Sequence, residues 1–242
     1  LLFPNMPGRG HDLARILGLL AVAYGCWLPA SLGLWPYTAG AAWAAVGLLV
    51  LASLGLARWR RLDMRELWRR HWREVWWSET AFLAGFAVFL LLRLLNPDLW
   101  HPLRGGEKPM EFGFLNAILR SPYMPPYDPF FSDGYINYYY YGLFAVSTLI
   151  KLTGVRPSVG FNLLIPTLAG LTFSGAFLLG WTLTGRRRFG AAAAGFVVLI
   201  GNLAGAFPIR GYGGLPEIAE ALRNLADPPL QGGVAGVFQG LG

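Results

Sequence analysis

Two glutamates, Glu107 and Glu111, are the residues of this sequence best placed to do chemistry together. They are four positions apart, a spacing that puts two side chains on one face of a helix. Pro109, between them, suits the first turn of such a helix. Paired carboxylates of this kind act as general bases or bind divalent cations. We therefore expect Glu107 and Glu111 to be catalytic and, if a cation is used, to bind Mg²⁺ or Mn²⁺.

The same part of the chain holds the other candidate site residues. Five of the thirteen acidic residues lie between positions 98 and 133, and Asp98 is a third candidate for a base or metal ligand. A leaving phosphate needs a cationic partner, for which Lys108 and Arg93 are the candidates. Arg93 has a structural alternative, because a long cationic side chain near the end of a span can snorkel to the headgroups. The remaining candidates for substrate contact are Asp128 in the rigid turn PPYDPFF, Asn137, Tyr138, Tyr139 and Tyr140.

The composition indicates a membrane protein. Of the 242 residues, 55% are hydrophobic and 14% are charged, whereas a soluble domain has about 25% charged residues. The net charge of +7 comes from basic residues that flank apolar runs, which favours membrane flanks over nucleic-acid binding. The sequence has no P-loop, nucleophile elbow or zinc-ligand spacing. It begins with Leu1 and stops in a glycine-rich stretch, so we expect a fragment of a longer protein.

The apolar runs predict about five transmembrane helices. The 42 residues between Arg15 and Arg58 contain no charge and are interrupted by Pro29 and Pro36, which indicates a helical hairpin over 13–34 and 37–57. Further spans are expected over 75–95, 158–184 and 189–208. Residues 138–152 are too short to cross a core of about 30 Å, so they should lie at the outer interface. Residues 58–77 predict a separate interfacial helix, with one face formed by Met64, Leu67, Trp68, His71, Trp72 and Val75.

Arginines set the expected orientation. Seven lie in 58–73 and three in 186–188, and positively charged loops face the cytoplasm. The loop 96–157, which carries the candidate site, should therefore be extracytosolic. We divide the chain into an N-terminal hairpin with a basic helix, 1–74, and a core, 75–242. The predicted fold is an all-α polytopic membrane protein with juxtamembrane helices in the outer loop, located in the cell membrane.

The outer loop also carries a resemblance. The stretch GGEKPMEFGFLNAILRSPYMPPYDPFFSDGYINYYYYG, followed by an apolar span and GRRRFG, resembles the uncharacterised YYY membrane proteins of bacteria and archaea. In that family the position of Glu111 is usually aspartate. The arrangement of spans is similar to the C-type (GT-C) glycosyltransferases, and EKP is similar to a stretch of the lipid A aminoarabinose transferases. The resemblance implies a catalytic acid in the outer loop and a polyprenyl-phosphate sugar as donor.

Two functional hypotheses follow. The first is a bacterial membrane glycosyltransferase that moves a sugar from a lipid-linked donor to an acceptor on the outer face, with membrane lipids and that donor as its partners. The second is a non-enzymatic scaffold or lipid-handling protein whose carboxylates pair with Arg104, Lys108 and Arg120. A transporter has less support, because Glu79 is the one carboxylate expected within a span.

Overall fold

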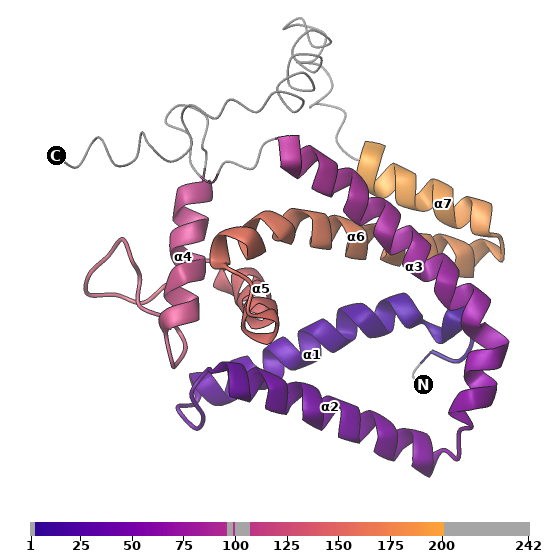
Figure 1. The fold of residues 1–242 in the computed structure, drawn as a ribbon, viewed down its shortest axis with the longest axis horizontal. Coiled ribbons are helices and arrows are strands. Elements are labelled where there is room, and N and C mark those ends of the chain that lie inside the picture. Colours follow the sequence, from indigo (N-terminus) through magenta and orange to yellow (C-terminus); the bar gives the residue numbers. More distant parts are fainter. Residues whose placement is uncertain (1–2, 96–98, 100–106, 201–242) are drawn as a thin grey trace, which may run out of the picture.

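The computed structural model describes residues 3–95, 99 and 107–200, and the regular elements of this part are all helical (Figure 1). The chain is therefore an all-α polytopic membrane protein, as the composition predicts. In chain order the elements are a short 3₁₀ helix Pro7–Arg9, α1 His11–Ser31, α2 Ala39–Trp59, α3 Met64–Leu95, α4 Lys108–Arg120, α5 Tyr140–Thr153, α6 Pro157–Thr184, α7 Arg187–Gly195 and a π-helical turn Phe196–Ile200.

Four helical segments of the described part are long and apolar enough to cross a membrane: Pro7–Ser31, Ala39–Trp59, Met64–Leu95 and Pro157–Thr184. They correspond to the first four predicted spans. The fifth predicted span, 189–208, coincides in part with α7 and the π-helical turn, and its end lies outside the described residues.

The hairpin of α1 and α2 is confirmed, and its turn has local causes. Pro29 lies in the last turn of α1, where its carbonyl accepts a hydrogen bond from the backbone N–H of Leu34 (2.9 Å). Gly33 adopts a left-handed φ of 69°, which glycine tolerates without steric cost. Thr38 then caps α2 by accepting a hydrogen bond from the backbone N–H of Ala41 (3.1 Å).

The separate interfacial helix predicted over 58–77 is wrong in its boundaries. Arg58 and Trp59 belong to α2, and α3 runs without interruption from Met64 to Leu95. Asp63 starts α3, because its carboxylate accepts a hydrogen bond from the backbone N–H of Arg65 (2.9 Å). No glycine or proline occurs between 64 and 84 to end the helix. The first turns of α3 nevertheless run across the ends of the other helices (Figure 1), and residue 74, where we divide the chain, lies inside it.

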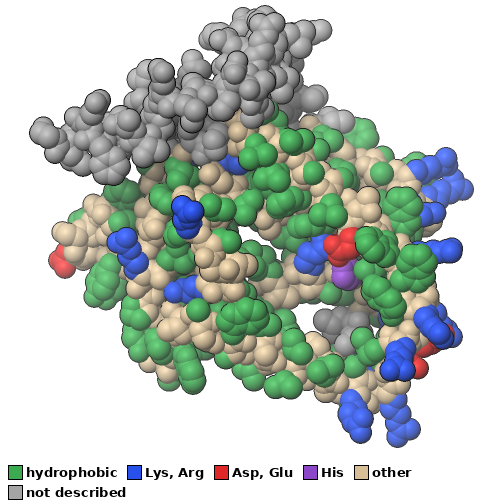
Figure 2. Space-filling view, viewed as in Figure 1, with side chains coloured by type: hydrophobic (Ala, Val, Ile, Leu, Met, Phe, Trp, Pro, Cys, Tyr) green, Lys and Arg blue, Asp and Glu red, His purple; other side chains and the backbone are tan. Residues whose placement is uncertain are grey.

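The basic residues gather at one end of the helix bundle (Figure 2). At this end α2 finishes, α3 begins and α6 turns into α7, and the Arg187 guanidinium lies 4.8 Å from the centre of the Trp77 ring. The loop between α4 and α5 lies at the opposite end (Figure 1). The arrangement agrees with the predicted separation of 58–73 and 186–188 from the loop. Which end faces the cytoplasm stays a prediction.

We expect thiol labelling to report this topology. In a variant whose Cys26 is replaced, a cysteine at position 107 should react with a membrane-impermeant reagent on intact cells. A cysteine at position 69 should react only after permeabilisation, because positive flanks stay inside. Labelling of position 107 only after permeabilisation would refute the orientation.

Small residues bring the long helices close together, as is common in membranes. A Cβ on Gly85 of α3 would lie 2.6 Å from the Cβ of Phe173 on α6, and one on Gly170 of α6 would lie 2.8 Å from the ring of Phe82 on α3. A Cβ on Gly190 of α7 would lie 2.6 Å from a backbone oxygen of α6. Helices α3, α6 and α7 thus form the tightly packed part of the structure.

Helices α4 and α5 complete the end of the bundle opposite the basic residues (Figure 1). The short helix predicted to begin near Pro109 is α4, which stands across the long helices and buries Phe114, Leu115 and Ile118 (Figure 1). The second helix, α5, has 14 residues, or about 21 Å at 1.5 Å per residue, against a hydrocarbon core of about 30 Å. Its length agrees with the prediction that it does not cross. Ile118 packs in a cluster with Ala30, Tyr37, Met124 and Phe144.

Candidate functional site

The first turn of α4 brings Glu107, Lys108 and Glu111 together. Glu107 occupies the N-cap position, and its carbonyl accepts a hydrogen bond from the backbone N–H of Glu111 (2.9 Å). The Glu107 side chain is exposed and that of Glu111 is half-buried. The positive end of the helix dipole favours anionic groups here. Two carboxylates and a cation therefore share one accessible helix end.

The ion pairing proposed for these carboxylates in the scaffold hypothesis can be examined in part. Neither carboxylate has an ion pair with another residue of the described part of the chain. Arg120 is at the other end of α4, nine residues from Glu111, or about 13 Å along the helix. Pairing with Arg120 is therefore wrong, and Arg104 lies outside the described residues.

Asp98 also lies outside the described residues, so its place in the site stays a prediction. Arg93, near the end of α3, is 9% exposed and makes an interaction within the protein. Its burial does not fit a side chain that snorkels to the headgroups.

Asp128 belongs to a structured hairpin. One of its carboxylate oxygens accepts a hydrogen bond from the backbone N–H of Phe130 (2.8 Å), and its own N–H donates to the carbonyl of Gly134 (3.0 Å). The rings of Tyr127 and Tyr135 stack across this hairpin with their centres 4.7 Å apart. Asp128 thus helps to shape the loop, and one of its oxygens is already used.

The residues of the tyrosine run differ in their exposure and in their contacts. Asn137, Tyr138 and Tyr139 are exposed, and the Tyr138 ring lies 6.3 Å from that of Phe114 on α4. Tyr140, in contrast, accepts a hydrogen bond from the indole N–H of Trp27 (2.9 Å) and so ties α5 to α1. The exposed tyrosines remain accessible to a ligand beside α4, whereas Tyr140 has a structural contact.

The expected cation has an incomplete set of protein ligands in the described part of the chain. Within the described ranges, no three His, Cys, Asp or Glu side chains lie close enough to hold a metal ion. Glu107 and Glu111 alone are the kind of partial set that Mg²⁺ uses, with one or two carboxylates plus phosphate oxygens and water. The pair thus fits a cation that arrives with a phosphorylated substrate better than a permanently bound one.

A buried polar network contacts the end of α4, and it could not be predicted from the sequence. The Tyr37 hydroxyl lies 2.6 Å from the Ser147 hydroxyl and 3.1 Å from that of Thr148, both on α5. The Lys151 ammonium lies 4.5 Å from the centre of the Tyr37 ring and donates to the carbonyl of Leu119, at the end of α4 (3.0 Å). Burial lowers the pKa of Lys151 and raises that of Tyr37 to about 12. The network joins the α1–α2 turn, α4 and α5 into one support.

Tyr37 should make stability depend on alkaline pH. Its pKa of about 12 in the folded protein exceeds the ordinary value of 10.0 because burial disfavours the tyrosinate. Between these two values the unfolded chain loses the proton and the folded chain keeps it. Stability is therefore intact below pH 10 and falls by about 2 kcal/mol as the pH rises to the folded pKa.

Comparing Tyr37→Phe with the wild type isolates this effect from the other tyrosines. The free energy of unfolding in detergent should fall more steeply in the wild type above pH 10. The variant should also lose about 1 kcal/mol at neutral pH, the net value of a typical hydrogen bond. Parallel pH curves for the two proteins would contradict the assignment.

The other end of the bundle holds a second polar cluster, which the sequence analysis missed. The His11 Nε2 atom lies 2.6 Å from a carboxylate oxygen of Glu79, and Arg15 donates to the same oxygen. Asp12, beside them on α1, is fully buried. The first span is predicted to begin at residue 13, and this boundary places Asp12 outside the membrane. The polar side chains at positions 11, 12 and 15 were the sequence signal for this cluster.

An apolar groove of about 690 Å³ lies between α1 and α2. Small residues such as Gly25, Ala41 and Ala45 leave this space, and all its lining residues are apolar or aromatic. A groove with this lining is suited to a hydrocarbon chain.

Comparison with known proteins identifies the family of this chain. Residues 21–225 match the sequence model of a family described as an uncharacterised membrane protein (DUF2298). No curated protein and no solved structure matches the chain. The match covers the second half of α1, all of α2, the loop 96–157 and the fourth span.

Proposed function

We propose a function from the geometry of this chain. The chain belongs to the DUF2298 family of uncharacterised membrane proteins, whose description names no activity. The proposed activity is glycosyl transfer from a polyprenyl-phosphate sugar to an acceptor at the extracytosolic face of the cell membrane.

One observation carries the proposal. A span, α3, leads away from the basic end; two short helices, α4 and α5, lie at the far end; and a second span, α6, returns (Figure 1). Glu107, Lys108 and Glu111 sit on the first turn of the outer helix, on a support held by Tyr37 and Lys151. A rigid support of this kind is what a catalytic group needs to keep its position. Similarity of architecture does not by itself prove function, so we infer the function from the side chains of the site.

The chemistry assigns a task to each side chain. An acceptor hydroxyl attacks the anomeric carbon of the donor sugar, the bond from that carbon to the phosphate oxygen breaks, and the polyprenyl phosphate leaves. Glu107 or Glu111 takes the proton of the attacking hydroxyl as a general base. Lys108 contacts the phosphate, whose negative charge grows as the bond breaks. A divalent cation, when bound by the carboxylates, would supply further charge stabilisation there.

The accessible aromatic residues next to α4 supply the remaining contacts. Tyr138 and Tyr139 offer exposed rings and hydroxyls, and Asn137 adds an amide. Amphipathic rings of this kind suit a site at the membrane surface, where one side of the ligand is lipid and the other is wet.

The purified protein, incubated with radiolabelled polyprenyl-phosphate sugars and a membrane extract, should transfer label to an acceptor. A lack of transfer with all donors tested, by protein that is folded and inserted, would count against the proposal.

A second candidate is a lipid-handling protein without transferase activity, and the apolar groove between α1 and α2 favours it. This candidate predicts that a bulky residue in the groove, such as Ala45→Leu, reduces lipid binding while Glu107→Gln has no effect. Glycosyl transfer predicts a loss for Glu107→Gln, so the same two variants separate the candidates.

A further inference from the structure

Asp12 is an unusual residue for a membrane helix. Its side chain is 0% exposed and forms no ion pair in the described part of the chain. The nearby hydroxyls of Ser78 on α3 and Ser174 on α6 are themselves 1% and 0% exposed. An ionised carboxylate in such surroundings costs several kcal/mol unless it is paired. Ionisable groups buried at membrane depth are rare and usually have a function.

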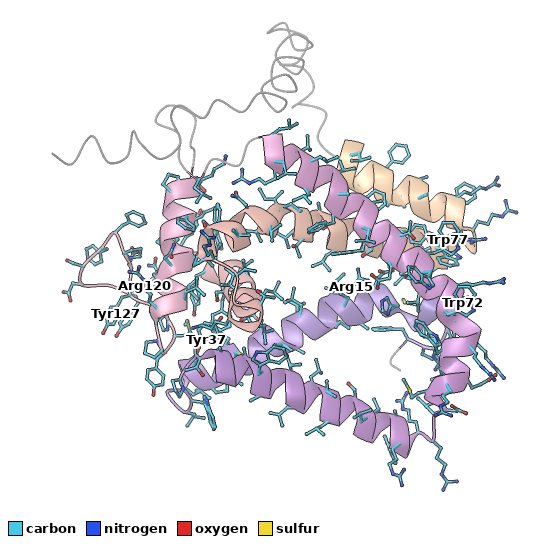
Figure 3. The ribbon with its side chains drawn as sticks, viewed as in Figure 1. Arg15, Tyr37, Trp72, Trp77, Arg120 and Tyr127 are labelled. Atoms are coloured by element: carbon cyan, nitrogen blue, oxygen red, sulfur yellow. The ribbon has the colours of Figure 1, made fainter. Side chains whose placement is uncertain are left out.

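Its neighbours form an ion-pair network that is more open. Glu79 accepts from Arg15 and lies 2.6 Å from His11, whose side chain is 36% exposed. The Arg15 guanidinium lies 4.3 Å from the centre of the Phe82 ring on α3. Figure 3 shows Arg15 between α1 and α3, and Figure 2 shows an opening in this face with basic, acidic and histidine side chains at its edge. His11 is thus partly exposed, whereas Asp12 is fully buried.

The charges of the four groups balance in a particular way. Arg15 and Glu79 cancel each other, which leaves His11 and Asp12. With one proton between these two residues the cluster is neutral. With none it has a net charge of −1, and with two a net charge of +1. Uncompensated charge is disfavoured in a medium of low dielectric constant, so the cluster should keep a single proton over a broad pH range.

We propose that Asp12 and His11 form a proton-binding site between α1, α3 and α6, in which Asp12 holds one proton at neutral pH. This site lies at the opposite end from the outer loop and does not depend on the proposed transferase activity. Asp12 holds the proton because it is the more deeply buried group. When Asp12 releases it, His11 is the adjacent acceptor.

The tautomer of His11 supports this transfer. The Glu79 carboxylate can only accept, so the Nε2 atom of His11 carries the hydrogen of their 2.6 Å contact. The Nδ1 lone pair is then the one on His11 that can accept a proton. The O–H bond of Asp12 breaks, an N–H bond forms on His11, and the product is an imidazolium beside two carboxylates and Arg15.

The other groups that face Asp12 do not replace His11. From α6 the nearby polar group is the uncharged Ser174, and from α3 they are Ser78 and the paired Glu79. Glu74, farther along α3, already accepts from the backbone of Gly8 and pairs with His71 (2.8 Å).

Infrared spectroscopy of the full chain in nanodiscs tests the proposal, because a protonated carboxyl group has a carbonyl band separate from the carboxylate bands. Wild-type protein at neutral pH should show this band, and it should shift when the aspartates are ¹³C-labelled. The band should be absent in Asp12→Asn and present in Asp133→Asn, a matched change of an exposed aspartate in the outer loop. In His11→Gln it should be at least as strong as in the wild type, because Asp12 then holds the single proton alone.

The labelled wild type makes the test independent of whether Asp12→Asn folds. If ¹³C-aspartate protein shows only carboxylate bands at neutral pH, in the wild type and in His11→Gln, the proposal is overturned. A carbonyl band that survives in folded Asp12→Asn would overturn it as well.

Discussion

Replacing Glu107 and Glu111 with glutamine should lower the rate of glycosyl transfer by a factor of about 100 or more, the effect of losing a positioned acid–base group. Glutamine keeps the shape of the side chain and removes its charge and its ability to take a proton. Neither carboxylate has an ion pair in the described part of the structure, so the loss of charge should leave folding intact. Activity should fall while the melting temperature stays near that of the wild type.

Glu66→Gln is the matched control for this prediction. Glu66 is an exposed acid in the first turn of α3, at the opposite end of the bundle, and it pairs with Arg70 (2.6 Å). An exposed i,i+4 pair is worth about 0.3–0.5 kcal/mol, so this variant should keep its activity. Full activity in both Glu107→Gln and Glu111→Gln would show that the site assignment is wrong.

Ile118→Ala should destabilise the protein by about 2–5 kcal/mol, the usual range for removing a large aliphatic side chain from a core. Ile118 is 0% exposed and packs against Phe144, Met124 and Tyr37, so the change leaves a cavity where α4, α5 and the α1–α2 turn meet. The free energy of unfolding in detergent measures the effect.

Ile165→Ala removes the same atoms from a site on α6 that is 46% exposed. It should cost much less, because little packing is lost there. Equal losses for the two variants would contradict the view that α4 and α5 form a packed support for the site.

Much of the fold could be predicted from local patterns. The apolar run between Arg15 and Arg58, broken near Pro36, was sufficient for the hairpin, and Pro109 between Glu107 and Glu111 predicted the start of α4. Both features depend on residues that are close in sequence. The continuity of α3 could not be judged in the same way, because a basic, tryptophan-rich segment and an apolar span have opposite polarity and yet contain no residue that ends a helix.

The site could be predicted only where its residues share one helix. The spacing of Glu107 and Glu111 was enough to bring them to the same end of α4. The structural use of Tyr140 depends on Trp27, 113 positions away, and the support at Tyr37 depends on Ser147, 110 positions away. No periodicity records such pairs. Asp12 was missed for a simpler reason. The first helix begins at His11, before the uncharged run after Arg15 from which the span was predicted.

The central claim is that the first turn of α4 is the site of glycosyl transfer. Its most direct test uses sealed proteoliposomes containing wild-type protein or Glu107→Gln, with a radiolabelled polyprenyl-phosphate sugar in the membrane and an acceptor in the outer solution. The account predicts that label leaves the lipid for the acceptor with the wild type when position 107 faces outward, and that the variant is slower by a factor of about 100. Equal transfer by the two proteins, or transfer only when position 107 faces the lumen, would contradict it.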